Sequence, residues 1–234
     1  SCQSVKVDRG RKMEFLIIYD KWKPKAEKLA LEMYRWFKER KIVSFIQPEN
    51  LDGFEGTADS AATESDFVIA LLLGGDGFII KNGYELARRN IRFIGINFGT
   101  VGYLAPVKPR DWMKAIGKIL DGRYTLERKK ILKGSLRDEE FYAVNDIVLF
   151  RGLQKFVRMK VKIDGDVVYR NIGGDGMIIC SAIGSTAYNL AAGGPIIEVG
   201  LALTPLAVHR VDIKPLTRDE NRVVEITCLG GSSD

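Results

Sequence analysis

The stretch LLLGGDGFII, residues 71–80, places the carboxylate of Asp76 among Gly74, Gly75 and Gly77 at the end of an apolar run. Glycines let the backbone come close to a ligand, and the free N–H groups of a loop that opens a helix suit phosphate. The alternative is a tight strand-to-helix turn in which Asp76 is the N-cap. The stretch lacks the Lys-Ser/Thr ending of a Walker A loop and the GxGxxG spacing of a hydride-transferring Rossmann site.

A second glycine-rich loop, INFGTVGYLAP at residues 96–106, follows another apolar run and contains Asn97, Gly99 and Gly102. Adjacent strands of a parallel sheet point their carboxyl-end loops into one crevice, so we expect this loop to lie beside the first. Tyr103 could offer an aromatic face to a nucleotide base. The alternative is a glycine-rich turn with Tyr103 packed in a core.

The second half of the chain holds two further candidates. Asn145 and Asp146 interrupt the apolar segment YAVNDIVLF, where an amide and a carboxylate are costly to bury unless they bind something or lie at an edge or bulge. The segment GGDGMIICSAIGSTAYNLAAGGP, residues 173–195, has a Gly-Ser-Thr step at 184–186. This step offers hydroxyl and backbone donors at an expected helix start, or is only a capped helix.

Strands and helices alternate in the first half, which predicts an α/β domain with a parallel sheet over residues 1–108. The expected strands are 13–20, 42–47, 66–73 and 91–97, and the expected helices are 24–41, with a stripe of Ala26, Leu29, Ala30, Met33 and Phe37, and 78–90. A further helix is expected at 109–122. The remainder, 109–234, is predicted to be a mainly β domain in which Asp164-Gly165 turns a hairpin.

Composition restricts the chemistry that the chain can perform. The 234 residues include His209 as the one histidine, and three cysteines without CxxC spacing, so a His-based metal site, a Ser-His-Asp triad, a zinc site and a disulfide framework are all disfavoured. Any chemistry must then rest mainly on carboxylates, amides, hydroxyls and cations. A net charge of +6 suits a polyanionic partner.

The distribution of charged and apolar residues also predicts the partners and the location of the protein. Basic residues are spread through segments such as KWKPKAEKLALEMYRWFKERK, which we interpret as a solvated face rather than a nucleic-acid site. No apolar run reaches the roughly 20 residues that span a bilayer, and the first residues lack a signal-peptide core. We therefore expect no nucleic-acid partner, no membrane and a cytoplasmic location.

Taken together, these motifs resemble the NAD kinase family over roughly residues 13–227. The parts that carry the resemblance are GGDG (74–77), GINFGTVGYL (95–104), VND (144–146), DGMIICSAIGSTAYNLAAGGPI (175–196) and LTPLAVH (203–209). The resemblance implies an α/β N-terminal domain followed by a sandwich-like β domain. It also implies transfer of the γ-phosphoryl group of ATP, or of a phosphoryl group of polyphosphate, to the 2′-hydroxyl of the adenosine ribose of NAD, giving NADP.

The resemblance also implies roles for individual residues. Asp76 would be the catalytic base or orienter at the 2′-hydroxyl, and the backbone of Gly74, Gly75 and Gly77 would face phosphate. The other implied or candidate nucleotide-binding residues are Asn97, Tyr103, Asn145, Asp146, Asp175, Ser185, Thr186, Ala187 and Tyr188. Mg²⁺ or another divalent metal would accompany ATP without a dedicated protein site, and the assembly would be a homodimer or homotetramer.

Two positions depart from the family pattern. Phe78 follows GGDG where the family usually has Thr or Ser, and Asp146 stands where it usually has Glu. These departures keep a non-catalytic NAD(P)-binding protein open as an alternative. A lipid kinase, which can share GGDG, is a second alternative that the segment GSTAYNLAAGGP disfavours.

Overall fold

The computed structural model describes residues 2–4, 13–48, 67–100, 102, 104–153, 155–208 and 213–230. The chain divides into two compact units, unit 1 at Ser1–Glu127 and unit 2 at Arg128–Asp234. Unit 1 contains a parallel sheet with helices, and the sheets of unit 2 are antiparallel. The predicted fold class is confirmed.

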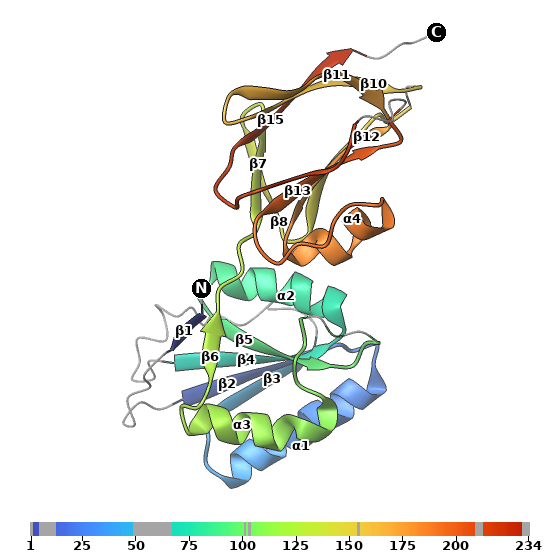
Figure 1. Ribbon diagram of the computed structural model, residues 1–234. Helices are drawn as coiled ribbons and strands as arrows, with labels where there is room; N and C mark the ends of the chain where they lie inside the picture. Colours follow the sequence, from blue (N-terminus) through green and yellow to red (C-terminus); the bar gives the residue numbers. More distant parts are fainter. Residues whose placement is uncertain are drawn as a thin grey trace. The chain divides into compact units, whose positions relative to one another are not determined.

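Unit 1 is built on a parallel sheet in the order β3-β2-β4-β5, with α1 and α3 on one face and α2 on the other (Figure 1). A short antiparallel pair, β1 with β6, completes its described strands. The elements are β1 (Cys2–Ser4), β2 (Met13–Tyr19), α1 (Pro24–Glu39), β3 (Ser44–Pro48), β4 (Phe67–Gly74), α2 (Asp76–Arg88), β5 (Arg92–Asn97), a 3-10 turn (Pro109–Asp111), α3 (Trp112–Leu120) and β6 (Thr125–Glu127).

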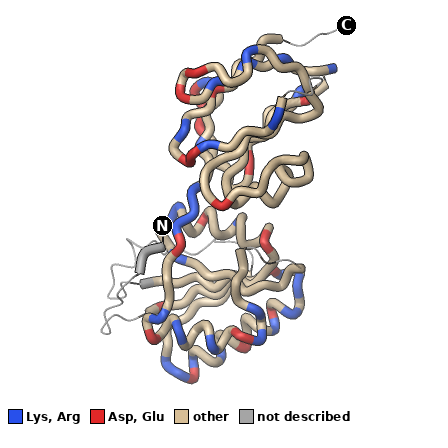
Figure 2. Tube along the Cα trace, viewed as in Figure 1, with Lys and Arg blue, Asp and Glu red and all other residues tan. Residues whose placement is uncertain are grey.

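The central strands of this sheet are apolar throughout because both of their faces are covered. Side chains alternate between the faces: Phe15 and Ile17 pack with α1 and α3, whereas Leu16 and Ile18 pack with α2. β4 accordingly carries no charged residue, whereas charges are frequent along α1 (Figure 2). Sheet and helices therefore hold the carboxyl ends of β2, β4 and β5 in fixed positions.

Helix α1 forms as its pattern predicts. Pro24 occupies the first helical position, where its missing N–H costs nothing. The predicted apolar stripe is the buried face of this helix, made of Ala26, Leu29, Ala30, Met33 and Phe37. The stripe packs on the sheet, which explains why so charged a segment is helical.

The boundary between the units lies after Glu127, not near residue 108 as the change of sequence texture suggested. The reason is the packing of α3. Trp112, Ile116 and Ile119 are buried in the same core as α1 and the sheet, and Trp112 meets Trp36 edge-on at 5.5 Å between ring centroids. The helix therefore belongs to unit 1.

Unit 2 consists mainly of two antiparallel sheets, ordered β11-β10-β15 and β14-β13-β12-β9. Their facing side chains share one core, in which Met159 and Val161 of the first sheet pack with Met177 and Leu203 of the second. The elements are β7 (Leu132–Leu136), β8 (Glu139–Ala143), β9 (Asp146–Phe150), β10 (Val157–Ile163), β11 (Asp166–Gly174), β12 (Gly176–Ser181), a 3-10 turn (Ile183–Thr186), α4 (Tyr188–Ala191), β13 (Leu201–Leu206), β14 (Leu216–Arg218) and β15 (Val224–Gly230).

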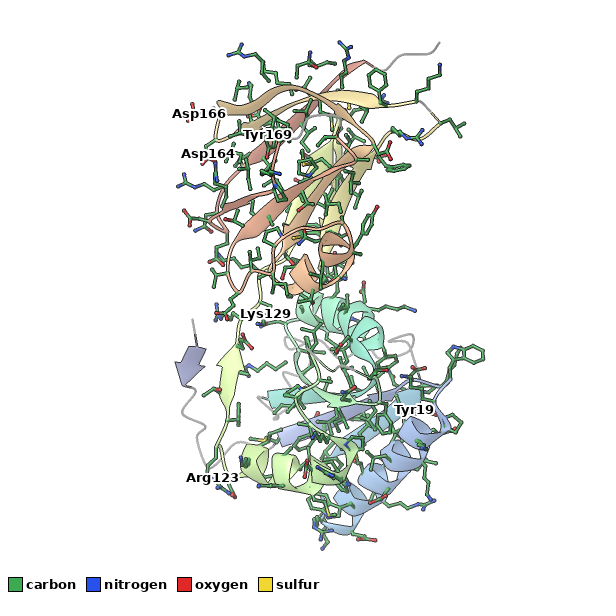
Figure 3. The ribbon with its side chains drawn as sticks, turned by 45° about the vertical axis from the view of Figure 1, so that its right-hand side comes forward. Tyr19, Arg123, Lys129, Asp164, Asp166 and Tyr169 are labelled. Carbon is green, nitrogen blue, oxygen red and sulfur yellow. The ribbon has the colours of Figure 1, made fainter. Side chains whose placement is uncertain are left out.

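The predicted hairpin at Asp164-Gly165 is confirmed. These two residues join β10 to β11 with φ of 51° and 89°, the left-handed values that a two-residue hairpin turn requires. Figure 3 labels Asp164 and Asp166 at this turn and Tyr169 further along β11. The Tyr169 hydroxyl donates to the Lys214 carbonyl, which ties the hairpin to the segment before β14.

Within the described ranges, no helix is long and apolar enough to cross a membrane. The thiols of Cys180 and Cys228 are both free. Cys180 is buried, and the loss of solvent raises the pKa of its thiol to about 11. At neutral pH that thiol is therefore protonated and behaves as a small apolar group.

Candidate active site

The first cluster of candidate residues is the glycine-rich edge of unit 1, which we define as residues 74–77, 97–100, 102, 104 and 105. β4 and β5 are parallel neighbours that pair Gly74 with Asn97. Directly beyond that pair, the Phe98 N–H donates to the Gly74 carbonyl at 2.8 Å. The two glycine-rich loops lie side by side, so the prediction from their places in the sheet is confirmed.

The glycines of this edge serve different purposes. A Cβ on Gly99 would lie 3.2 Å from the Gly75 Cα, so the two loops approach each other backbone to backbone. Gly77 faces open space, with nothing within 4 Å of a Cβ built there. Gly74 instead lies against Phe78, because a Cβ on Gly74 would be 2.7 Å from the Phe78 Cβ. Gly75 and Gly77 fit the predicted approach to phosphate, whereas Gly74 makes room for a core side chain.

Phe78 replaces the family's hydroxyl with a packing group. Its ring joins the apolar cluster between α2 and the sheet, beside Ile79 and Leu86. Its carbonyl accepts from the buried Asn82 side chain at 2.9 Å, one turn further along α2. The departure therefore replaces a hydroxyl with apolar packing between α2 and the sheet.

Asp76 is the first residue of α2, and Gly75 is the N-cap without a side-chain hydrogen bond. The alternative that Asp76 caps the helix is therefore wrong. Its carboxylate turns to the second loop instead: the Leu104 N–H donates to Oδ1 at 3.1 Å and the Gly102 N–H to Oδ2 at 3.2 Å. These two bonds hold the carboxylate in one orientation.

Asn97 shapes the second loop. Its Oδ1 accepts the Gly99 N–H at 2.6 Å, and Gly102, at φ 77°, lies so close to the Asn97 amide that no side chain fits there. Contact of Asn97 with a nucleotide stays a prediction. Tyr103, predicted to lie beside the adenine, falls outside the described residues.

Sequence reasoning missed Lys23 at this edge. The residue lies in the turn after β2, and its Nζ donates to the Phe98 carbonyl at 2.8 Å. A Cβ on Gly75 would be 3.4 Å from that nitrogen. The basic run that includes Lys23 was interpreted as a solvated face, and only the arrangement of the sheet separates this lysine from its neighbours.

The second cluster, in unit 2, is the Asn145 cluster, which we define as residues 144–146 and 181–185. The Ser181 N–H donates to the Asn145 carbonyl at 2.9 Å, and the Ser181 hydroxyl donates to the Val144 carbonyl at 2.6 Å. Gly184 must be glycine, because a Cβ there would be 2.6 Å from the Asn145 Cα. Two motifs far apart in the sequence thus form one structure.

Two polar groups in this cluster have lost part or all of their contact with water. The Asn145 Oδ1 is buried and has no hydrogen-bond partner within the described part of the chain. Asp146 begins β9, an edge strand of its sheet, and desolvation raises the pKa of its carboxyl group. A buried acceptor without a partner is rare and costly, so the Asn145 amide is suited to a ligand that donates a hydrogen bond.

A neighbouring network is complete by contrast. The Asn189 Nδ2 donates to the Ser185 and Pro195 carbonyls at 3.2 and 2.9 Å, and its Oδ1 accepts the Thr204 hydroxyl at 2.6 Å. The fully buried Ser185 hydroxyl donates to the Ala182 carbonyl at 2.8 Å. These side chains hold residues 183–195 in place, and a nucleotide contact by Ser185 stays a prediction.

The other predicted nucleotide-binding residues are divided between the ends of β12. Thr186, Ala187 and the exposed Tyr188 follow the Asn145 cluster directly. Asp175 precedes β12, at the end opposite Ser181, where its carboxylate pairs with Arg151 at 2.8 Å. Unit 2 therefore does not bring Asp175 to the Asn145 cluster, and its predicted role remains untested.

No group of three or more His, Cys, Asp or Glu side chains that could hold a metal occurs among the described residues. Mg²⁺ is usually held by one or two carboxylates together with substrate phosphates and water. Asp76 at the glycine-rich edge fits a metal of that kind, which would arrive with a phosphate substrate.

A parallel sheet with glycine-rich loops at its carboxyl edge is the architecture of nucleotide-binding α/β proteins. Comparisons with known proteins narrow this class. Residues 15–124 match the family model of the ATP-NAD kinase N-terminal domain, and residues 144–233 match that of the ATP-NAD kinase C-terminal domain.

Curated relatives agree with these matches. An NAD kinase of Clostridium botulinum (strain Loch Maree / Type A3) is 34% identical over 211 residues, covering 87% of this chain and 72% of the relative. An NAD kinase of Caldicellulosiruptor saccharolyticus is 36% identical over 192 residues, covering 80% and 72%. The chain belongs to the NAD kinase family.

Solved structures share the fold. The yeast NADH kinase complexed with NADH has a TM-score of 0.75 at 19% identity, covering 97% of this chain and 77% of that one. The NAD kinase from Archaeoglobus fulgidus in complex with ATP has a TM-score of 0.68 at 23% identity, covering 92% and 81%.

Proposed function

We propose that this protein is an NAD kinase, which transfers a terminal phosphoryl group from ATP or polyphosphate to the 2′-hydroxyl of the adenosine ribose of NAD. The observation that carries this proposal is the Asp76 carboxylate, fixed by the Gly102 and Leu104 N–H groups at a glycine-rich edge suited to phosphate. Family membership removes the lipid-kinase alternative.

Phosphoryl transfer requires the protein mainly to position the two substrates and to neutralise the charge on the phosphates. The hydroxyl oxygen attacks the terminal phosphorus, the bond to the donor's bridging oxygen breaks, and ADP or a shortened polyphosphate leaves. A ribose hydroxyl is a very weak acid, so Asp76 accepts its proton as the new P–O bond forms. General-base help of this kind is worth about 10²- to 10⁴-fold in rate.

Charge on the donor is the second requirement. Mg²⁺ supplies electrostatic neutralisation of the donor phosphates when it is bound to them. Backbone N–H groups at the start of α2 supply donors to the same anion, and Gly75 and Gly77 let the phosphates approach.

Recognition of the acceptor falls to the Asn145 cluster. The unpaired Asn145 Oδ1 accepts a hydrogen bond from the adenosine portion of NAD, which offers an exocyclic amine and ribose hydroxyls. Asp146, one methylene shorter than the family's Glu, supplies a second acceptor beside it. Tyr188, which follows the Asn145 cluster along the chain, presents an exposed aromatic ring.

NADP formation from NAD tests the proposal, with ATP and Mg²⁺ in one series and polyphosphate and Mg²⁺ in another. An NADP-specific dehydrogenase detects the product, and a parallel series with NADH tests the reduced acceptor. Turnover with at least one donor supports the proposal and identifies the donor. A folded protein that binds NAD without turnover would instead be a non-catalytic NAD(P)-binding protein.

We also propose a homodimeric or homotetrameric assembly, which the family resemblance supports, and a cytoplasmic location. Sedimentation equilibrium measures the first, and a monomer at all concentrations would contradict it. Cell fractionation measures the second.

A further inference from the structure

Lys23 lies at the carboxyl edge of the unit 1 sheet, in the turn that follows β2. The turn is anchored to the neighbouring strand, because the Asp20 N–H donates to the Leu73 carbonyl at 3.0 Å, one residue before Gly74. The Lys23 N–H in turn donates to the Asp20 carbonyl at 2.9 Å. The backbone of Lys23 is therefore positioned by the strand that carries the glycine-rich loop.

The side chain of Lys23 is fixed against the two loops. Its Nζ donates to the Phe98 carbonyl at 2.8 Å and lies 3.4 Å from the position of a Cβ on Gly75. The residue is partly buried, whereas Lys21 and Lys25 on either side are exposed. Phe98 supplies one acceptor, and an ammonium group has three N–H donors.

No carboxylate within the described residues forms an ion pair with Lys23. Other lysines of the chain do pair, such as Lys133 with Glu140 at 2.6 Å and Lys130 with Glu220 at 2.7 Å. The nearby Asp76 carboxylate is turned to the Gly102 and Leu104 N–H groups instead. A partly desolvated cation that has no counter-ion in the described part of the chain favours an anionic ligand.

The start of α2 adds positive potential at the same place. The first intrahelical bond of α2 runs from the Ile79 N–H to the Gly75 carbonyl, so the N–H groups of residues 76–78 precede it and have no intrahelical acceptor. The helix dipole places its positive end there. An ammonium group and a helix N-terminus side by side attract the same anion.

We propose that Lys23 binds the phosphate chain of the phosphoryl donor and neutralises the charge that develops on it during transfer. The shared chemistry is a phosphoanhydride chain, supplied either by ATP or by inorganic polyphosphate. Lysine suits this role because it is a compact point charge that can hold phosphates without bidentate geometry. The inference rests on the proposed NAD kinase activity and adds a residue to its donor site.

Steady-state kinetics of Lys23→Gln, Lys23→Arg and Lys25→Gln test the proposal, with each donor and with NAD varied separately. Loss of a charged hydrogen bond to phosphate is expected to lower kcat/KM for ATP and for polyphosphate about 10- to 100-fold in Lys23→Gln. The KM for NAD should change by less than about twofold. Lys23→Arg should retain most activity, and the exposed Lys25→Gln should match wild type.

The choice of glutamine separates phosphate binding from a structural role. Its side-chain amide keeps an N–H donor but places it one bond nearer the backbone, and a lysine that only holds the second loop would affect the KM values for donor and NAD alike. Wild-type donor kinetics in Lys23→Gln would therefore overturn the proposal. An equal rise in the KM values for donor and NAD would do so too. Thermal unfolding checks the fold, and Lys23→Met serves if the glutamine variant is unstable.

A binding measurement tests whether Lys23 binds a phosphate chain without requiring turnover. Inorganic tripolyphosphate is titrated calorimetrically into the wild-type chain, Lys23→Gln and Lys25→Gln. At least about tenfold weaker binding by Lys23→Gln alone supports the proposal. Equal binding by all three overturns it. If the wild type forms no NADP, the proposed function fails, while this titration still decides whether Lys23 holds a phosphate chain.

Discussion

The glycine-rich edge of unit 1 and the Asn145 cluster of unit 2 differ in how their polar groups are satisfied. At the edge, both oxygens of Asp76 and the oxygen of Asn97 accept backbone N–H groups from the same loop. In the cluster, the Asn145 oxygen has no partner within the described residues, and the Asp146 carboxyl group is desolvated.

This difference indicates two kinds of preparation for a ligand. A reacting carboxylate must be held in one orientation before the substrate arrives, and backbone donors hold it at little entropic cost. A recognition group can instead be left unsatisfied, because the bond that the ligand supplies is then worth more. The cost of the unpaired group is borne by the folded protein until the ligand binds.

The largest expected effect on stability comes from the complete network beside the Asn145 cluster. Asn189→Ala removes three hydrogen bonds and leaves the buried Thr204 hydroxyl and two carbonyls unpaired. We expect a loss of about 2–4 kcal/mol in the free energy of unfolding, measured by urea denaturation. Asn171→Ala, at an exposed position, is the matched control. If Asn189→Ala lowered the free energy of unfolding no more than this control does, the network would not contribute to stability.

The next effect tests why Gly74 is glycine. Gly74→Ala pushes a methyl group into the Phe78 side chain and should cost about 1–3 kcal/mol of stability. In a Phe78→Ala background the same change should cost less, because the ring is gone and only the Cβ of residue 78 still obstructs the methyl group. Gly77→Ala, at an open helical position, should be neutral or stabilising. A cost for Gly74→Ala that is unchanged in the Phe78→Ala background would show that the glycine serves some other contact.

Asn145→Leu sharpens the comparison, because it should separate stability from binding. Removing a buried amide oxygen that has no partner among the described residues should leave the free energy of unfolding unchanged or slightly higher. The affinity for NAD should fall by about tenfold or more, as the ligand loses its acceptor. Isothermal titration and urea denaturation of one preparation measure both quantities. A large loss of stability with intact NAD binding would refute the assignment.

The smallest effect concerns pH. Desolvation in the folded protein raises the pKa of Asp146 above its ordinary value of 3.8, so the ionised carboxylate destabilises the fold at neutral pH. That cost disappears as the pH falls through the raised pKa. Asp146→Asn should therefore be more stable than wild type near pH 7 and equal to it near pH 3. A difference in stability that does not depend on pH would contradict the desolvation.

The sequence predicted the parts of this structure that follow from local pattern and strand order. The stripe of α1, the Asp164-Gly165 hairpin and the contact between the two glycine-rich loops were all predicted. Each depends on residues close in the chain or on one rule about parallel sheets. The alternative role of Asp76 as N-cap failed because its partners lie 26 and 28 residues further along the chain.

Other features could not be predicted because they depend on packing between distant segments. The apolar face of α3 suits either domain, and only the core around Trp36 assigns it to unit 1. Asp175 belongs to the same sequence motif as Ser181, yet a whole extended strand separates them. Lys23 has the same residue type as Lys21 and Lys25, and only the turn after β2 distinguishes it.

The proposed role of Asp76 is tested most directly by comparing wild type and Asp76→Asn in kcat for NADP formation and in Kd for NAD. Asparagine keeps one acceptor oxygen for the Gly102 or Leu104 N–H, and thermal unfolding verifies that the loop remains folded. We predict that kcat falls by at least about 10²-fold while Kd for NAD changes by less than about threefold. An unchanged kcat would contradict a role for Asp76 in phosphoryl transfer.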